Sequence, residues 1–391
     1  MLGIVILVAL QLFCRAPADP RTGPPLPETP PNVEPLPHPF QPGDDLQQPF
    51  AEAQQLRRLP PAEAIPESPR EVPATANFGY VPEPAEAGEF VASLENPTLR
   101  QAAPELFLAR GPPARDEENA KATLLYRYVL EVDPTWRVKA QGIGDCVSWG
   151  WAHGVDHLNA IDAIQKRQPE TWMPAATEPI YGGSRVEARG KAGDGERPVG
   201  GWSDGSYGAS AARWVRDYGV LWRKNYETLG VDLSRYSSSR AKEWGAYGAG
   251  GKGDGGRLDE AAKSHPVRTV ALVTTFEEAA KAIENGYPVA VCSGQGFSST
   301  RDKDGFAAPR GSWAHCMVFI GVRWDREGLL CLNSWGPNWI GGEKWPQDQP
   351  DGSFWVDRRT ADRMLGGWKD SYAMSGLVGF PRRKLRHGEG W

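Results

Sequence analysis

Residues 141–149 read Gln-Gly-Ile-Gly-Asp-Cys-Val-Ser-Trp, a glycine-rich turn that leads into an apolar stretch with a cysteine at its start. The stretch from Cys146 to about Gln165 is predicted to be a helix with a mixed apolar face. A thiol at the start of a helix lies near the positive end of the helix dipole and near unpaired backbone N–H groups, and both favour the thiolate. Cys146 is therefore a candidate nucleophile. Asp145, directly before it, either caps the helix or raises the pKa of the thiol by like-charge repulsion.

Two later segments supply partners for a nucleophilic cysteine. Residues 312–315 read Ser-Trp-Ala-His at the head of one predicted strand, and residues 331–336 read Cys-Leu-Asn-Ser-Trp-Gly at the end of the next. An imidazole beside a cysteine stabilises the thiolate and can later protonate a leaving amine, and an asparagine can orient its ring. We therefore expect His315 to act as base and acid and Asn333 to hold the imidazole.

Gln141 is the candidate donor to the oxyanion that forms when a thiolate attacks a carbonyl group. Its side-chain amide, together with the backbone N–H of Cys146, would bind the developing negative charge. Preorganised donors of this kind stabilise the transition state more than the ground state. The sequence thus predicts a catalytic set of four residues.

These motifs together resemble the papain-like cysteine peptidase family. The most specific piece is Asn-Ser-Trp-Gly-Pro-Asn-Trp at residues 333–339. Residues 288–291 are similar to the family's strand before the histidine, and residues 372–377 are similar to its C-terminal segment. The resemblance covers about residues 140–381 and is that of a divergent, bacterial-type member. It implies a thiol peptidase that hydrolyses peptide bonds in peptide or protein substrates, with no cofactor and no metal ion.

The resemblance also implies a substrate-binding set. Trp335 would shield the hydrogen bond between the histidine and the asparagine, and Gly205 would contact the substrate backbone. Cys292 and Cys316 stand where the family has small apolar residues around the pocket for the side chain preceding the cleaved residue; burial in the core is the alternative for both. Gln141 stands five residues before the cysteine, one fewer than in papain, which makes its reach into the oxyanion site a specific point to test.

The predicted elements give the fold class. Residues 206–218 are predicted to be a second helix, ended by Gly219. From residue 267 onward, short apolar runs bounded by turn residues predict strands at 267–274, 289–292, 316–322, 329–332 and 353–356. Helices first and strands later predict an α+β fold. In the papain-like two-lobed fold, a helical lobe carries the cysteine helix, and an antiparallel sheet or barrel lobe carries the histidine and the asparagine.

The N-terminus has the pattern of an export signal. Residues 2–13 form an apolar run that is too short to cross a bilayer comfortably, and Ala16-Pro17-Ala18 supplies a cleavage site. Residues 1–18 are therefore predicted to be a signal peptide, with a lipidated Cys14 as the alternative. The mature protein is expected to be secreted or in the cell envelope, with no stable membrane span after processing.

The rest of the chain divides by composition. Residues 19–84 contain about half of the 35 prolines, and residues 19–115 are predicted to be either a Pro-rich disordered linker or an inhibitory pro-region. Residues 116–381 are predicted to be the peptidase domain, and residues 382–391 a basic C-terminal tail. A net charge of −5 with acids and bases interspersed predicts no nucleic-acid partner. The sequence makes no prediction of oligomeric state.

Three other patterns carry weaker signals. His153 and His157 share a helical face with Cys146, but about 10 Å of helical rise separates Cys146 from His153, too far to share one metal ion. Residues 201–205 match a serine nucleophile elbow and residues 248–253 match a phosphate-binding loop, yet neither follows an apolar strand. We expect structural histidines and loops there.

Two alternatives to a peptidase remain open at this point. One is a catalytically inactive papain-like protein that keeps the cleft and binds peptides. The other is a thiol amidase or transpeptidase acting on cell-wall peptides, which would use the same cysteine and histidine.

Overall fold

The structure is a computed structural model that describes residues 75–108, 122–189, 198, 203–265 and 267–385. The predicted signal peptide and residues 386–391 of the predicted basic tail at 382–391 lie outside the described residues. The helices are α2 (Pro84–Ala92), α3 (Leu99–Ala102), α4 (Tyr126–Val132), α5 (Cys146–Gln165), α6 (Thr177–Arg185), α7 (Gly208–Asp217), α8 (Ser238–Tyr247), α9 (Arg257–Ala262), α10 (Phe276–Glu284) and α11 (Arg358–Trp368). Among the described residues, we find no helix both long and apolar enough to cross a membrane.

The strands form one large sheet and one small hairpin. They are β1 (Thr75–Asn77), β2 (Ala122–Leu124), β3 (Asn225–Tyr226), β4 (Val231–Asp232), β5 (Thr269–Leu272), β6 (Val289–Arg301), β7 (Ala307–Arg323), β8 (Gly328–Leu332), β9 (Gly341–Gly342), β10 (Ser353–Asp357) and β11 (Tyr372–Ser375). The large sheet has the order β10-β8-β7-β6-β11-β5, and every pair along this path is antiparallel. β1 and β2 both pair with β7, and β3 pairs with β4 in the hairpin.

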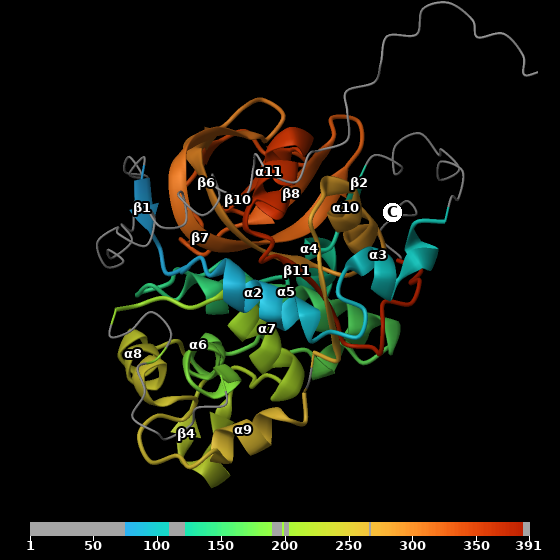
Figure 1. Cartoon of the computed structure of the whole chain (residues 1–391). Coiled ribbons are helices and arrows are strands. Elements are labelled where there is room, and N and C mark those ends of the chain that lie inside the picture. The colour runs from blue at the N-terminus through green and yellow to red at the C-terminus, as the bar shows by residue number, and fades with distance from the viewer. Residues whose placement is uncertain (1–74, 109–121, 190–197, 199–202, 266, 386–391) are drawn as a thin grey trace, which may run out of the picture. The chain divides into compact units, whose positions relative to one another are not determined.

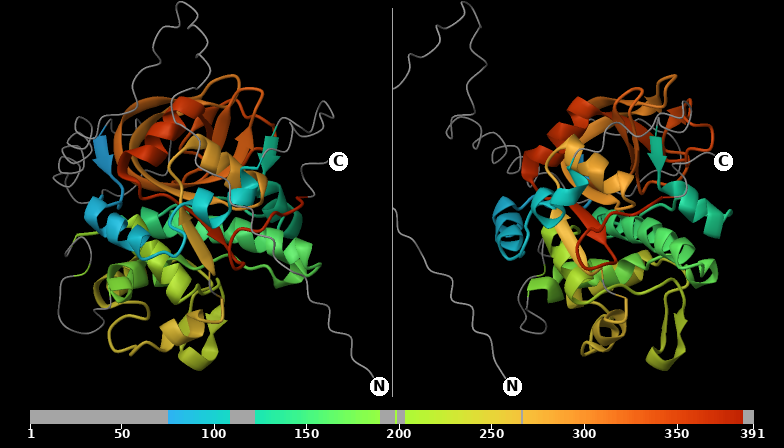
Figure 2. Two further views of the ribbon diagram at one scale, coloured as in Figure 1. Left: turned by 45° about the vertical axis from the view of Figure 1, so that its right-hand side comes forward. Right: turned by 90° about the vertical axis from the view of Figure 1, so that its right-hand side faces the viewer.

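The long helix α5 lies between the sheet and the helices α6 and α7. It packs against β7 and β6 on one side and against α6 and α7 on the other. In both views of Figure 2, α5 lies in green between the orange strands and the yellow-green helices. The part of the chain that the structure describes thus forms a sheet lobe and a helical lobe, with the cysteine helix at their junction (Figure 1).

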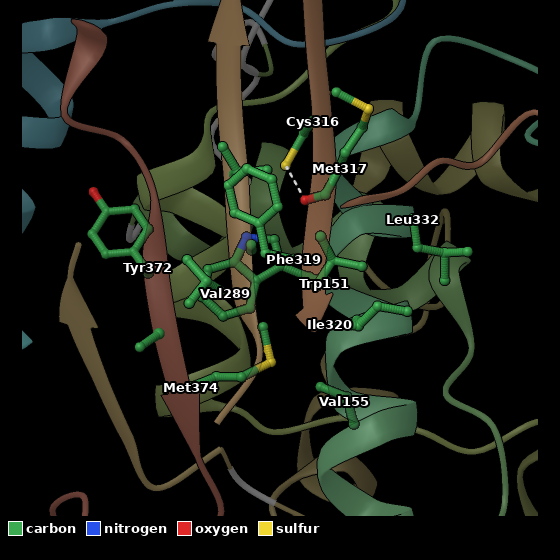
Figure 3. Close-up of a cluster of buried hydrophobic side chains, with 14 of the residues drawn as sticks. Trp151, Val155, Val289, Cys316, Met317, Phe319, Ile320, Leu332, Tyr372 and Met374 are labelled. Carbon is green, nitrogen blue, oxygen red and sulfur yellow. Dashed lines mark hydrogen bonds between the residues drawn. The ribbon is translucent and has the colours of Figure 1, made fainter. Parts of the chain in front are cut away.

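The contact between α5 and the sheet is the apolar centre of this arrangement. Trp151 and Val155 of α5 point toward Val289, Phe319 and Met374 from three strands (Figure 3), and all five side chains are buried. A Cβ at Gly154 would come within 2.5 Å of the Met374 side chain. Glycine at this position therefore lets the helix approach the strand closely, which fixes the position of its N-terminus against β7.

The predicted α+β class is confirmed, with differences in strand length. The helix beginning at Cys146 ends at Gln165 as expected, and Gly219, with φ of +98°, follows the helix predicted before it. The prediction that His315 heads its strand is wrong, because β7 begins at Ala307. Residues 307–312 are partly polar and exposed, so the apolar pattern misses them, but they pair with β6 across the full strand.

Residues 75–108 belong to the stretch expected to be a linker or a pro-region. In the structure they form β1, α2 and α3. Phe90 and Leu99 are fully buried in the apolar core, and α2 packs against α7 of the helical lobe. These residues therefore contact both lobes.

Candidate active site

Cys146 is the first residue of α5 and is completely buried. Asp145 occupies the position before the helix, but its side chain makes no capping hydrogen bond. Its Oδ2 instead accepts a hydrogen bond of 2.9 Å from the Tyr236 hydroxyl. The side chain of Asp145 therefore does not cap α5, and burial raises the pKa of its carboxyl group.

His315 and Asn333 form a direct hydrogen bond. His315 Nε2 and Asn333 Oδ1 are 2.7 Å apart. The same oxygen accepts the backbone N–H of Ser334 at 2.7 Å, which identifies it as the acceptor end of the amide. Nε2 must then carry the ring proton, and the neutral imidazole has its free lone pair on Nδ1. Nδ1 is buried and has no hydrogen-bond partner among the described residues.

The thiol lies against the backbone next to this imidazole. The backbone N–H of Cys316 donates to Cys146 Sγ at 3.3 Å. Position 316 directly follows His315 on β7, so the N-terminus of α5 and the central strand of the sheet meet at this point. The structure thus places Cys146 of α5 against the residue after His315 on β7, and it joins His315 to Asn333, which follows β8, while Nδ1 of His315 has no hydrogen bond to the thiol.

Gln141 completes the group through four hydrogen bonds. Its side-chain Nε2 donates to the carbonyl oxygens of Phe78 and Ile143, each at 2.9 Å. Its Oε1 accepts from the Ser334 hydroxyl at 2.7 Å, and its backbone N–H donates to the Ser334 carbonyl at 2.8 Å. Ser334 follows Asn333 directly, so the five-residue spacing brings Gln141 to the same site despite the departure from papain.

Trp335 covers the imidazole from one side. Its ring stacks on His315 with centroids 4.8 Å apart and planes inclined by 28°. The Phe78 ring contacts Trp335 at 4.3 Å and His315 at 5.3 Å. The hydrogen bond between His315 and Asn333 is consequently enclosed by aromatic rings, which exclude water and strengthen it.

Residues 75–81, here named the covering segment, lie across the site between the two lobes. β1 pairs in parallel with residues 312–314 of β7, and the Phe78 N–H donates to the Ala314 carbonyl at 2.9 Å. On the helical lobe, the Ser206 N–H donates to Gly79 O at 2.9 Å, and the Val81 N–H donates to Ser206 O at 3.0 Å. The covering segment therefore joins both lobes, with the Phe78 ring against the imidazole of His315.

Gly79 is the tightest point of the covering segment. Its φ is +111°, a conformation that only glycine adopts readily. A Cβ at this position would overlap the carbonyl oxygen of Gly144, in the turn before Cys146. At Gly79, the backbone of the covering segment therefore lies directly against the backbone of the turn before Cys146, with no room for a side chain between them.

Burial sets the protonation of the central pair. It raises the pKa of the Cys146 thiol well above 9, and the neighbouring Cys316 and Asp145 raise it further. Burial also lowers the pKa of His315 to about 4, although the hydrogen bond to Asn333 opposes this effect. Since a charge in a dry site has lost its solvation, both groups are neutral at pH 7 while the site is covered.

The predicted substrate-binding residues lie around the same centre. Gly205 faces the Val81 side chain and the Gly79 carbonyl. Cys292 and Cys316 are paired across β6 and β7, with sulfur atoms 2.8 Å apart. Both thiols are buried, and the backbone N–H of Cys316 also donates to Cys146 Sγ.

The minor sequence signals have structural explanations. His157 Nδ1 lies 2.6 Å from the carbonyl oxygen of His153, and both rings contact Trp136 inside the protein. In the part of the chain that the structure describes, no group of three or more His, Cys, Asp or Glu side chains is arranged to hold a metal ion. Residues 248–253 follow α8 rather than a strand, and residues 201 and 202 of the serine pattern lie outside the described residues.

Sequence reasoning missed the residues that cover the site. Phe78, Gly79 and Tyr80 are part of an aromatic run at the end of the Pro-rich stretch. That run was the available signal, since aromatic side chains are rare in disordered linkers. Asp370, which hydrogen-bonds Tyr80, carries no local pattern that identifies it.

The comparisons with known proteins give structural matches alone. No protein-family model matches the sequence, and no curated protein matches it either. Among solved structures, the chain is similar to xylellain, a cysteine protease from Xylella fastidiosa, with 14% sequence identity and a TM-score of 0.43; the match covers 81% of this chain and 98% of that chain.

Two further similar structures are proteases in their proforms. Digestive procathepsin L 3 of the Tenebrio molitor larval midgut is 17% identical, with a TM-score of 0.38 and coverage of 74% of this chain and 79% of that chain. The ragweed pollen allergen Amb a 11, a cysteine protease, is 16% identical, with a TM-score of 0.38 and coverage of 71% and 74%. Independently of these matches, the arrangement of the elements is the papain-like one expected from the sequence. A helix that begins with Cys146 packs against an antiparallel sheet; His315 lies on one of its strands, and Asn333 directly follows another.

Proposed function

We propose that this chain is a cysteine peptidase in which Cys146 is the nucleophile, His315 the general base and acid, and Asn333 the orienting group. The observation that carries the proposal is the 2.7 Å hydrogen bond between His315 Nε2 and Asn333 Oδ1. This hydrogen bond leaves Nδ1 as the basic nitrogen of the His315 ring. The next residue, Cys316, donates its backbone N–H to the Cys146 sulfur. This is the tautomer that a thiol–imidazole pair needs.

The reaction would follow from these positions. His315 Nδ1 takes the thiol proton, and the Cys146 thiolate attacks the carbonyl carbon of the scissile bond. The imidazolium then gives its proton to the amine nitrogen as the C–N bond breaks, leaving an acyl-thioester on Cys146. His315 next removes a proton from water, which hydrolyses the thioester and releases the acid product.

Gln141 would stabilise the negative charge on the attacked carbonyl oxygen. Its amide already donates to a carbonyl oxygen, that of Phe78, at 2.9 Å. The Ser334 hydroxyl and backbone hold the amide from the other side. Such an oriented donor acts without reorganisation when charge develops, which is the condition for a large effect on kcat.

The proposal includes an inhibitory role for the covering segment. Ala314 and Ser206 would offer backbone groups to a substrate, and both already bond to residues 78–81. Cys146 and His315 are both fully buried and carry no charge at pH 7 under this cover. Of the two roles open for residues 19–115, we therefore favour the pro-region over the linker.

The identity of the alkylated residue tests the proposal. Treatment with an epoxysuccinyl thiol-protease inhibitor, after the covering segment is loosened by Gly79→Ala, should add one inhibitor per chain at Cys146. An adduct at Cys292, Cys316 or Cys331, or no adduct in a folded chain, would contradict it. A panel of substrates that includes cell-wall peptides then separates a general peptidase from an amidase or transpeptidase.

A further inference from the structure

The covering segment buries one side chain, that of Tyr80, in a pocket formed by residues from α7 and from the end of α11. Tyr80 is fully buried, and its hydroxyl donates to Asp370 Oδ2 at 3.0 Å. Its ring packs against Trp368 with centroids 5.3 Å apart. Trp368 is the last residue of α11, and Asp370 lies in the turn after it, 290 residues further along the chain than Tyr80.

The base of this pocket is a carboxyl group held in a fixed orientation. The Gly208 N–H donates to the same Asp370 Oδ2 at 3.0 Å. A Cβ at Gly208 would come within 2.7 Å of that oxygen, so the start of α7 closes tightly on the carboxyl group. Asp370 is 2% exposed, and its Oδ1 has no hydrogen-bond partner among the described residues.

A chain of contacts connects the pocket to the reaction centre. The Cys292 N–H donates to the Ser371 hydroxyl at 3.3 Å, and Ser371 directly follows Asp370. Cys292 and Cys316 touch through their sulfur atoms at 2.8 Å, and the Cys316 N–H contacts Cys146 Sγ at 3.3 Å. A peptide whose side chain occupies this pocket would therefore have its backbone near Cys146.

The main chain around Tyr80 is held through backbone groups that any residue supplies. Gly79 O and the Val81 N–H bond to the two backbone groups of Ser206. Sequence preference at this position must then come from the side chain in the pocket. The pocket supplies an aromatic wall and one acceptor at its base.

The surroundings of Asp370 favour a neutral donor over a cation. Burial raises the pKa of Asp370 to about 7, although the hydroxyls of Tyr372 and Tyr80 lower it. Bringing a lysine or arginine into the pocket would require desolvating a second charge. A phenol donates one hydrogen bond without that cost, whereas a phenylalanine would remove one of the two hydrogen bonds that Asp370 Oδ2 accepts from described residues, those of Tyr80 and of the Gly208 N–H.

We propose that the pocket formed by Trp368, Asp370 and Gly208 is a specificity subsite that binds tyrosine side chains of peptide substrates, with Tyr80 occupying it in the covered protein. This inference rests on the proposed peptidase function for its substrate, but the pocket itself can be tested without turnover. Asp370 is the specificity-determining residue, because it distinguishes tyrosine from phenylalanine.

The first experiment measures access to Cys146 in the full chain. Iodoacetamide alkylation is followed by mass spectrometry of the Cys146 peptide in wild type and in Tyr80→Phe. Loss of the Tyr80 hydroxyl should speed alkylation at least about tenfold, since it removes the hydrogen bond to a buried carboxyl group. Asp370→Asn should also speed alkylation, and it serves as the second variant if Tyr80→Phe does not fold.

Tyr126→Phe is the matched control. The Tyr126 hydroxyl donates to Asp348 Oδ1 over the same distance, 3.0 Å, and its ring is also buried, but it lies on α4 away from the covering segment. It should leave the alkylation rate unchanged. Wild-type rates in both Tyr80→Phe and Asp370→Asn would overturn the inference, and so would equal acceleration in Tyr126→Phe.

The second experiment uses turnover in the Gly79→Ala chain. A positional-scanning set of fluorogenic peptides should show one position where tyrosine gives at least about tenfold higher kcat/KM than phenylalanine, and Asp370→Asn should reduce that ratio. Equal rates for the two residues, or preference for arginine, would overturn the subsite while the peptidase proposal stands. If no peptide is hydrolysed, the peptidase proposal fails, and the alkylation rates still decide whether the pocket holds a phenol.

Discussion

The side-chain amide of Gln141 donates a 2.9 Å hydrogen bond to the carbonyl oxygen of Phe78. The donor that the sequence predicts for a substrate oxyanion thus holds a carbonyl group of the chain's own N-terminal region. Phe78 also places its ring against His315 and Trp335. One residue of the covering segment therefore contacts Gln141, His315 and Trp335 at once, and these contacts are how the covering segment would close the proposed site.

Gly79→Ala should open the site. Alanine would be strained at φ of +111°, and its Cβ would overlap the Gly144 carbonyl, so the covering segment must move away. We expect peptide hydrolysis and Cys146 alkylation to rise at least about tenfold over wild type, since the strain is of order 1–3 kcal/mol before the overlap is counted. The rates of peptide hydrolysis and of Cys146 alkylation are measured in the variant and in the wild type at the same protein concentration.

Gly230→Ala is the control for that prediction. Gly230 also has positive φ, +67°, but a Cβ there meets nothing within 4 Å. It should lower the melting temperature slightly and leave both rates at the wild-type level. Activation by Gly230→Ala would indicate general loosening rather than release of the covering segment.

Asn333→Ala should lower kcat more than it raises KM. The Asn333 amide orients the imidazole, and this orientation counts mainly in the transition state. The measurement is steady-state kinetics of the Gly79→Ala chain with and without the second substitution. An unchanged kcat would assign Asn333 a structural role alone.

Gln141→Ala in the Gly79→Ala chain should reduce kcat by roughly 10- to 1,000-fold, the scale for losing one oxyanion donor. Gln141→Glu is the matched variant, because a carboxylate keeps the acceptor for the Ser334 hydroxyl and loses the N–H donors. Both variants should lose activity to a similar extent. Wild-type kinetics in either would remove Gln141 from the reaction, and melting curves must accompany the rates.

The reactivity of Cys146 should depend on pH differently in the covered and opened forms. In the covered form, burial raises the pKa of the thiol well above 9 and lowers that of His315 to about 4, so both groups are neutral between pH 5 and 8. The deprotonated thiol is then a minor form that grows about tenfold per pH unit. Alkylation of the full chain should rise with this slope up to pH 9.

In the Gly79→Ala chain, water reaches the pair, and a charged thiolate–imidazolium pair becomes accessible. Its alkylation rate should be higher at pH 6 and nearly constant between pH 6 and 8. The comparison is made by mass spectrometry of the Cys146 peptide across this range. The same steep slope in both chains would show that opening does not change the protonation of the pair.

The elements that carry the site were predictable because their signals are local. The α5 boundaries follow from the glycine turn and the apolar pattern after Cys146, and the strands around His315 and Asn333 follow from short apolar runs. The hydrogen bond between His315 and Asn333 joins residues 18 positions apart, one on β7 and the other directly after the neighbouring strand β8, so strand pairing brings them together.

The cover of the site could not be predicted in the same way. The contact of Tyr80 with Asp370 joins residues 290 positions apart, and neither position has a periodic pattern that specifies the other. The parallel pairing of β1 with β7 is three residues long, too short to stand out in a Pro-rich stretch. Both contacts are set by the packing of the two lobes, which only the three-dimensional structure contains.

The most direct test of the central claim compares peptide hydrolysis by the Gly79→Ala chain with that of the Gly79→Ala/Cys146→Ala chain. The covering segment is loosened in both chains, and the two proteins differ by a single sulfur atom at residue 146. We predict turnover of a fluorogenic peptide mixture in the first chain and none in the second, at equal melting temperature. Equal turnover in both chains, or no turnover in the first chain while its Cys146 is rapidly alkylated, would contradict the claim that this protein is a Cys146 peptidase closed by its own residues 75–81.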